Sequence, residues 1–275
     1  MKLIRFVHER GLVAHLPADS QSIRDRYGLR PVLVTEARES GDALDVLLSA
    51  EGKFLELEAS SLYFQAPKNI SLLLKKLALG YDVGAVVYHC RQLANAYAAA
   101  SREFARIRAI PGHPESESGY VSFGYQAVPY YELDALLSAV RRVYDKTAHL
   151  AWEAFGGTGG GMPDNIADML KRCRNVPRDV ADRLKSSWDT VGCKVKDYRD
   201  CTQHFASTDI GQCTLTMARL DGGVWTTSAL IPDNPGVKSK KKFSYASHLD
   251  ALTYGWGVTS EVVSLATEIW SACSG

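Results

Sequence analysis

The sequence lacks most of the features that assign a chain to a protein class at first sight. Its six cysteines are scattered, and no two of them stand at the C-x-x-C spacing of zinc or redox sites. No stretch approaches the roughly 20 apolar residues of a membrane-spanning helix, and MKLIRFVHER carries its charges too early for a signal peptide. The sequence therefore predicts a cytoplasmic protein with reduced thiols that does not enter a membrane.

A surplus of charge is also missing. Lysine and arginine number 32 against 31 aspartates and glutamates, so the formal net charge is +1. This balance excludes a chain that coats nucleic acid with its whole surface, but it leaves room for a local basic site. The glycine-rich GGTGGGMPDN lacks the lysine and the hydroxyl residue of a phosphate-binding loop, and no histidine and acidic residues stand at metal-ligand spacing. We therefore predict neither a cofactor nor a metal.

The residues that are present divide the chain into a β-rich beginning and a helical remainder. Residues 1–66 hold four short aliphatic segments, separated by Gly, Pro, Asp or Ser, and predict a small β-rich module. From about residue 67 the apolar residues recur with a helical period. Residues 67–275 form the second predicted domain, and the 46% of hydrophobic residues in the chain is enough for a sizeable core.

Apolar residues at alternating steps of three and four predict four long helices that pack as an antiparallel bundle. The first starts at Ser71 and runs for about forty residues, and the second follows Pro129. The third has Pro177 in its first turn, and the last extends from about Ser244 to Cys273. The apolar seam of the first helix comprises Val83, Val86, Cys90, Leu93, Tyr97, Ala100, Phe104 and Ile107.

Between the third and the last helix, the turn sequence DGG separates two β-like segments and predicts a hairpin at about 210–231. The predicted fold class is therefore α+β: a small N-terminal β-rich module followed by an antiparallel helical bundle with an inserted β-hairpin. Three cysteines that fall within helical patterns, Cys90, Cys193 and Cys273, are expected to be buried as small apolar residues.

The segment DYRDCTQHF, residues 197–205, lies at the end of the third predicted helix and carries a pattern suited to phosphate chemistry. On an ideal helix, Arg199 lies beside the core-facing stripe, whereas Asp200 and His204 lie together on the outer side, one turn apart. None of these three residues is needed to fill the core. The core-facing positions are Tyr198, Thr202 and Phe205.

These side chains suit the cleavage of RNA without a metal. His204 would take the proton from a ribose 2′-hydroxyl, or protonate the leaving oxygen. Arg199 would stabilise the charge on the pentacoordinate phosphate, and Asp200 would hold the imidazole and raise its pKa. Because residues five apart on a helix are offset by about 140°, one copy gives an open site, and a second copy across a two-fold axis would build a cleft.

At these residues the sequence resembles the HEPN superfamily, whose members are helical-bundle proteins and in many cases ribonucleases. The family signature is Arg-x-x-x-x-His, and here it runs from Arg199 to His204 with Asp200 in the polar position. The resemblance implies a homodimer whose interface holds the active site, and an acidic residue from an upstream helix. That helix offers Glu132 and Asp134, of which Glu132 lies off the apolar seam.

The resemblance covers roughly residues 71–275 by architecture but only six residues by motif. It implies a metal-independent endoribonuclease, of the kind found in defence or toxin–antitoxin systems, with RNA as substrate and an antitoxin as a protein partner. The chain departs from one part of the family: Ala206 stands where members paired with nucleotidyltransferases carry a tyrosine. The β-rich module is not explained by the resemblance.

A run of lysines, KSKKKF, offers a second contact for RNA. Lys238, Lys240, Lys241 and Lys242 could bind the phosphate backbone, and Phe243 could stack on a base. A solvated surface loop is the usual meaning of such a run.

Two other functions fit the same sequence. In the first, the bundle is a non-catalytic dimeric interaction module, and Arg199 and His204 are solvated surface residues. In the second, the bundle binds a small molecule in a polar pocket lined by Tyr97, Tyr144 and Trp256, although such positions more often form core. The two readings differ from the nuclease in whether Arg199 and His204 are needed for function.

Overall fold

The computed structural model describes residues 2–7, 13–17, 30–36, 70–108, 120–125, 127–156, 161–204, 214–219, 225–237, 239–247 and 249–273. The domain boundary predicted near residue 66 lies outside these residues. The chain forms two compact units, each built from three separate stretches. Unit 1 comprises Met1–Lys53, Cys90–Asp134 and Cys201–Tyr254, and unit 2 comprises Phe54–His89, Ala135–Asp200 and Gly255–Gly275.

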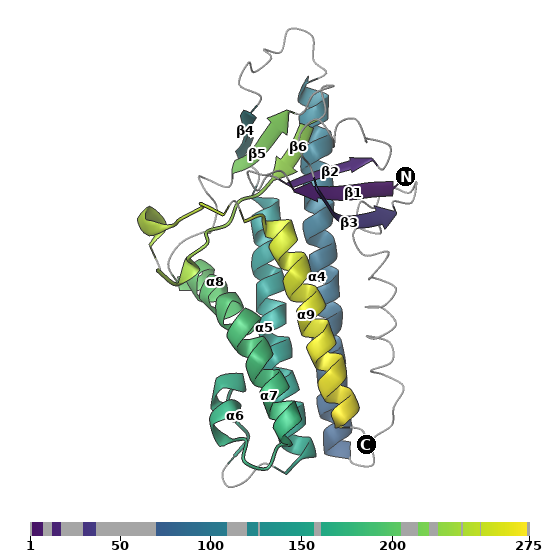
Figure 1. Ribbon diagram of the computed structural model, residues 1–275, viewed down its shortest axis with the longest axis vertical. Coiled ribbons are helices and arrows are strands. Elements are labelled where there is room, and N and C mark those ends of the chain that lie inside the picture. The colour runs from purple at the N-terminus through teal and green to yellow at the C-terminus, as the bar shows by residue number, and fades with distance from the viewer. Residues whose placement is uncertain are drawn as a thin grey trace. The chain divides into compact units, whose positions relative to one another are not determined.

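Helices dominate the described residues (Figure 1). They are α4 (Ile70–Arg108), α5 (Val128–Ala154), α6 (Ile166–Arg172), α7 (Arg178–Ser187), α8 (Cys193–His204) and α9 (Ala251–Ala272), with the short turns η1 (Trp188–Gly192), η3 (Pro235–Val237) and η4 (Lys240–Lys242). The long first helix is confirmed, since α4 has 39 residues. Pro177, which was predicted in the first turn of the third helix, directly precedes α7, because proline fits the start of a helix where the amide hydrogen has no helical partner.

Six short strands pair antiparallel in two groups of three. The first group has the order β2 (Val13–Pro17), β1 (Lys2–Val7), β3 (Arg30–Glu36). The second has the order β4 (Tyr120–Tyr125), β5 (Thr214–Arg219), β6 (Trp225–Ser228).

The predicted α+β fold class, with a β-rich module and an inserted β-hairpin, is wrong. The part of the chain that is described with its side chains is about 81% helical and contains no sheet. Alternating apolar residues indicate that a segment locally prefers an extended backbone. They do not show whether that segment packs into the hydrophobic core of the protein. The core of the described residues is built from helix faces, so the fold class that the structure supports is a helical bundle.

Ion pairs join the helices of unit 2 to one another. Arg142 of α5 donates to Asp82 of α4, with Nε 2.7 Å from Oδ1. Arg183 of α7 contacts two carboxylates of α9, Glu261 at 2.7 Å and Glu268 at 2.5 Å. Between the helices lie fully buried aliphatic residues, which supply most of the stabilisation because apolar burial is the dominant favourable contribution to folding. They include Leu79, Val83, Leu136, Val140, Leu184, Val262 and Leu265.

A π-helical turn, η1, interrupts the third predicted helix and separates α7 from α8. Trp188 starts this turn, and a Cβ at Gly192 would collide with the Trp188 ring, so only glycine fits there. The ring packs edge-to-face on Tyr144 with centroids 5.5 Å apart, and the Arg141 guanidinium lies 4.6 Å from the ring centroid. The turn therefore makes room for one large aromatic side chain between α5 and α7.

A buried carboxylate organises the described part of unit 1. Asp250 is 1% exposed and accepts hydrogen bonds from the Tyr97 hydroxyl at 2.6 Å, the Ala229 amide at 3.1 Å and the Thr253 amide at 3.0 Å. The Tyr97 oxygen in turn accepts from the amides of Ala229 and Leu252, both at 3.2 Å. Burial raises the pKa of Tyr97 well above its usual value, so its hydroxyl stays protonated and donates.

The predicted start of the last helix is wrong, and Asp250 marks the observed start. That helix begins at Ala251 and not near Ser244. The Asp250 side chain accepts from the amide three residues later, which is the geometry of an N-cap. The residues before it form a loop held by side chains: Asn234 accepts from the Ser244 amide at 2.8 Å, and Asp233 accepts from the Ser247 amide at 3.2 Å.

We predict that Tyr97→Phe lowers the free energy of unfolding by about 1–3 kcal/mol, because it removes a donor to Asp250 and takes from the buried Leu252 amide the oxygen to which it donates. Urea unfolding followed by circular dichroism measures the change. Tyr88→Phe is the matched control, since Tyr88 is exposed and its loss of a hydroxyl should cost less than about 0.5 kcal/mol. Equal effects of the two substitutions would contradict the role given to the Tyr97 hydroxyl.

Candidate functional site

The residues of the predicted motif lie on α8, which ends at His204. The segment from Arg199 to His204 therefore forms the last six residues of the helix. The boundary between the two units falls between Asp200 and Cys201. Arg199 and Asp200 are accordingly described with unit 2, and Thr202 with unit 1. The side chain of His204 lies outside the described residues.

The Asp200 carboxylate lies between two cations. Lys196, one turn earlier, places its Nζ 2.7 Å from Oδ2 of Asp200, and Nη1 of Arg199 lies 3.6 Å from Oδ1. The Arg199 side chain is 35% exposed, so part of it remains open to solvent. This arrangement offers one arginine and one lysine to an anion, with a carboxylate that holds both near the same side of the helix.

An acidic residue of α5 contacts the motif within unit 1. The Thr202 hydroxyl donates to Oδ1 of Asp134 at 2.5 Å, although the sequence placed Thr202 on the core-facing seam. Asp134 is one of the two acidic residues that the resemblance offered, and Glu132 is half-buried two positions earlier. The participation of Glu132 stays a prediction, whereas the contact between Asp134 and the motif helix is observed.

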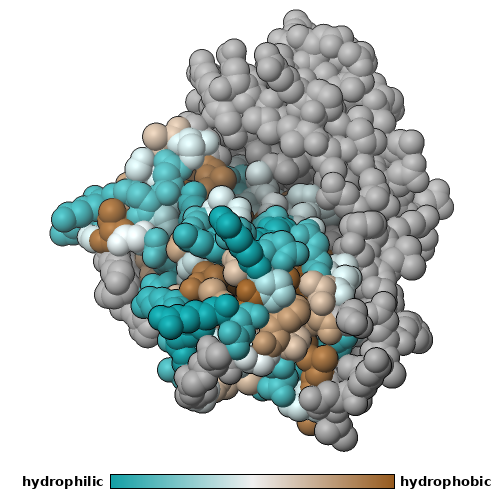
Figure 2. Space-filling view, turned by 60° about the horizontal axis from the view of Figure 1, so that its bottom comes forward, coloured by the Kyte–Doolittle hydropathy of each residue, from teal (hydrophilic) through white to brown (hydrophobic). Residues whose placement is uncertain are grey.

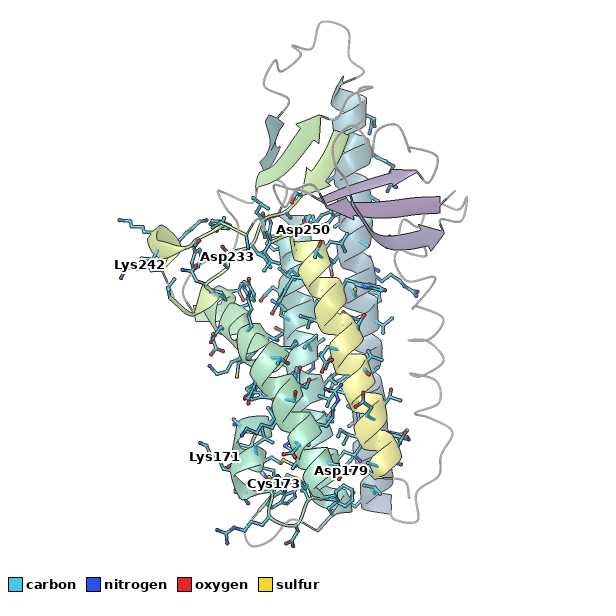
Figure 3. All side chains as sticks on the ribbon, in the orientation of Figure 1. Lys171, Cys173, Asp179, Asp233, Lys242 and Asp250 are labelled. Carbon is cyan, nitrogen blue, oxygen red and sulfur yellow. The ribbon has the colours of Figure 1, made fainter. Side chains whose placement is uncertain are left out.

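The lysine run lies on a loop with a defined shape. Lys240, Lys241 and Lys242 form the short turn η4 and are exposed, and Figure 3 shows the Lys242 side chain pointing away from the ribbon. Lys238 lies outside the described residues. Besides accepting from Ser244, the Asn234 amide donates to the Lys242 carbonyl at 3.1 Å. The loop therefore presents its cations from a backbone that side-chain hydrogen bonds already hold.

Aromatic side chains follow the lysines on this loop. The rings of Phe243 and Tyr245 pack edge-to-face with centroids 6.5 Å apart, and both residues are half-buried. A flat ring beside a cluster of ammonium groups is the pair of features by which single-stranded nucleic acid is bound without reading its sequence.

The residues suggested for a small-molecule pocket are part of the core. Tyr97, Tyr144 and Trp256 are all buried. The Tyr97 hydroxyl is bonded to Asp250 and the Tyr144 hydroxyl lies 2.9 Å from Oγ of Ser187. Because both hydroxyls have partners within the protein, these residues serve packing and internal hydrogen bonding.

The sequence analysis did not foresee one buried cation, and it wrongly predicted that two thiols are buried. Lys76 is 1% exposed, and its Nζ lies 4.1 Å from the centroid of the Trp270 ring. Burial lowers the pKa of Lys76, and the ring offers a cation–π contact in place of water. The sequence signal for this contact was the pair of lysines inside an apolar run. Cys193 is exposed and Cys273 is half-buried, so neither is buried as expected, whereas Cys90 is buried.

Over the described ranges, no helix has both the length and the apolar character needed to cross a bilayer. Among the described side chains, no group of histidine, cysteine and acidic residues is arranged to hold a metal ion. No protein-family model matches the chain, and neither a curated protein nor a solved structure shows significant similarity to it. Membership of the HEPN superfamily therefore stays a prediction that rests on the motif and on the helical bundle.

We predict that Asp134 and Thr202 are energetically coupled. Thr202→Val and Asp134→Asn each remove one side of the hydrogen bond, so the double variant should lose about 1 kcal/mol less than the sum of the single losses. A double-mutant cycle in urea measures this coupling, and Thr202→Ser, which keeps the hydroxyl, serves as the control. If the loss of stability in the double variant equals the sum of the two single losses to within about 0.3 kcal/mol, the contact contributes nothing to stability.

Proposed function

We propose that this chain is a metal-independent endoribonuclease of HEPN type, with Arg199 and His204 as the catalytic residues. The observation that carries the proposal is that α8 ends at His204, so that the motif stands on the last six residues of a helix within a helical bundle. A second support is the partial exposure of Arg199, because a guanidinium that binds a phosphate of the substrate has to be accessible.

In the proposed reaction, His204 takes the proton from a ribose 2′-hydroxyl, and the 2′-oxygen attacks the adjacent phosphorus. The bond from phosphorus to the 5′-oxygen breaks, and the leaving oxygen receives a proton. The products are a 2′,3′-cyclic phosphate and a 5′-hydroxyl end, so no oxidant, metal or water is consumed. In a homodimer one His204 acts as the base and the partner subunit's His204 as the acid.

The carboxylate beside the motif has a supporting role in this proposal. Asp200 contacts Lys196 and Arg199, and it thereby holds the guanidinium and limits the number of conformations that Arg199 samples. Less conformational freedom in the free enzyme means a smaller entropic cost when the phosphate binds. We therefore assign Asp200 the role of a positioning residue. Glu132 is the acidic residue that we expect to assist the reaction.

Lys240, Lys241 and Lys242 supply the contact with the RNA backbone in this proposal. Their loop is held by Asn234 before any ligand arrives, which lowers the conformational entropy lost on binding. The resemblance that suggests the activity also suggests the setting, namely a homodimeric toxin or defence nuclease held inactive by a protein partner. RNA, a second copy and an antitoxin are thus the proposed partners.

The second candidate function is a non-catalytic dimeric interaction module. It is favoured by the large apolar residues that α4 exposes, since exposed apolar surface marks sites of protein contact. In this function Arg199 and His204 are dispensable. The two candidates are therefore separated by substituting these two residues.

We expect the purified full-length chain to cleave unstructured RNA in the presence of EDTA. His204→Ala should abolish cleavage because it removes the acid and the base, and Arg199→Ala should lower the rate by about 10²–10³-fold, as for loss of one donor to a developing anion. Gln203→Ala, which alters an exposed neighbour on the same helix, and Arg178→Ala, which removes a 94% exposed arginine elsewhere, are the controls. Equal activity in all five proteins would rule out the nuclease.

We also predict that replacing Lys240, Lys241 and Lys242 together by glutamine weakens RNA binding and flattens its salt dependence. Each contact with a phosphate of single-stranded RNA releases counterions and contributes about −0.7 to the slope of log K against log salt, so three lost contacts should change the slope by about 2. Fluorescence anisotropy with a labelled oligoribonucleotide and the His204→Ala protein measures binding without cleavage. An unchanged slope would exclude this loop from the RNA contact.

A further inference from the structure

The contact between α4 and α5 in unit 2 carries opposite charges at one level and basic side chains at the next. The two helices lie side by side and run in opposite directions (Figure 1), and Asp82 of α4 pairs with Arg142 of α5 at 2.7 Å. Lys75 stands seven residues before Asp82, and His149 stands seven residues after Arg142. Because seven residues make nearly two full turns of a helix, Lys75 and His149 face each other across the same contact.

A second lysine joins this level of the contact. Lys146 lies one turn before His149 on the same side of α5, and Lys75, Lys146 and His149 are all half-buried. Burial lowers the pKa of His149, and the two lysines lower it further because their positive charges disfavour a charged imidazole nearby. Lys75, Lys146 and His149 are here called the basic cluster.

The carboxylate that also acts on His149 is already engaged by other groups. Oδ2 of Asp145 accepts from Nε of Arg141 at 3.1 Å, and its Oδ1 accepts from the Ile166 amide at 3.1 Å. Among the residues that the structure describes, no carboxylate forms an ion pair with either lysine of the basic cluster. Since Asp145 and Arg141 balance each other, the basic cluster keeps the two positive charges of its lysines.

The imidazole of the basic cluster is held in a defined orientation. Nε2 of His149 lies 2.8 Å from the Pro163 carbonyl oxygen. A carbonyl can only accept, so Nε2 carries the proton of the neutral ring and Nδ1 carries a lone pair. Protonation would therefore add a second donor at Nδ1 and leave the bond to Pro163 intact. Arg172 holds the same connection through the Gly161 carbonyl at 2.6 Å, so the backbone beside the basic cluster is fixed from two sides.

We propose that the basic cluster binds a phosphate monoester, held by the ammonium groups of Lys75 and Lys146 and by His149 in its charged form. A phosphate monoester carries close to two negative charges at neutral pH, which matches the two lysines. A carboxylate or a phosphodiester carries one charge and leaves one lysine unmatched. The ligand is thus a small molecule with a terminal phosphate, distinct from the RNA chain of the proposed nuclease.

A half-buried position gives a phosphate group both access and affinity. All three residues of the basic cluster keep part of their surface in solvent. Figure 2 turns forward the end of the molecule at which α6 lies in Figure 1, and hydrophilic residues gather on the described surface there, with smaller apolar patches among them. Charge pairs at a half-buried site are stronger than on open surface, because less water and salt screen them.

The test titrates the full-length chain with methyl phosphate at constant ionic strength and follows the His149 imidazole by NMR. The His149→Gln protein identifies the signal. Methyl phosphate should shift this signal towards the charged form and raise the pKa of His149, because a bound anion favours the positive ring. Dimethyl phosphate, the diester with one charge, should bind at least about tenfold more weakly.

Substitution of the two lysines tests their part in the site. Lys75→Gln and Lys146→Gln should each raise the dissociation constant of methyl phosphate at least about tenfold, because each removes a charge-assisted hydrogen bond. Lys171→Gln, at an exposed lysine of α6, is the control and should not change it. In chloride alone, both cluster variants should unfold in urea at the same or a higher concentration than the unsubstituted chain, since each removes a repulsion between like charges.

Three results would overturn the phosphate site. They are an unchanged His149 signal up to about 50 mM methyl phosphate, equal binding of methyl and dimethyl phosphate, and unchanged binding in both cluster variants. A loss of stability in both cluster variants in chloride would also contradict it, because the lysines would then serve the fold. The nuclease proposal is judged separately, by RNA cleavage in the Arg199 and His204 variants.

Discussion

The described bundle depends on the burial of one face of α4, a helix that carries apolar residues on two opposite faces. Its inner face supplies fully buried residues such as Leu79, Val83 and Val86 to the core of the described bundle. Its outer face carries Leu74 and Tyr81 in solvent. Because apolar burial is the main driving force of folding, the inner face of α4 explains why the bundle forms.

Buried polar contacts decide where the helices begin. Asp250 is 1% exposed, and a buried carboxylate is tolerated only with several hydrogen bonds. The Tyr97 hydroxyl and the Thr253 amide provide them, so the carboxylate fixes the first turn of α9. The loop before α9 is held by Asp233 and Asn234 in the same way, and this gives the lysines of η4 a constant position within unit 1.

The sequence predicted the presence of the long helices, because their apolar residues are spaced with the helical period of 3.6 residues. It failed where contacts between distant residues determine the structure. The predicted α+β class was wrong, and the capping role of Asp250 was not predicted. The π-helical turn at Trp188 was also not predicted, because it depends on a ring packed against α5. For the candidate site, position on α8 was predictable from the motif. The bond between Thr202 and Asp134 was not, since the sequence favoured Glu132, which lies off the apolar seam, as the acidic residue near the motif.

The proposed function is chemical: His204 and Arg199 would direct a ribose 2′-hydroxyl onto the neighbouring phosphate. The most direct measurement uses an oligonucleotide that carries a single ribonucleotide in an otherwise deoxy strand, incubated with the full-length chain and EDTA. We expect one cut, 3′ of the ribonucleotide, with a 2′,3′-cyclic phosphate end, and no cut in the all-deoxy strand. Cleavage of the all-deoxy strand, or an intact strand in every case, would contradict it.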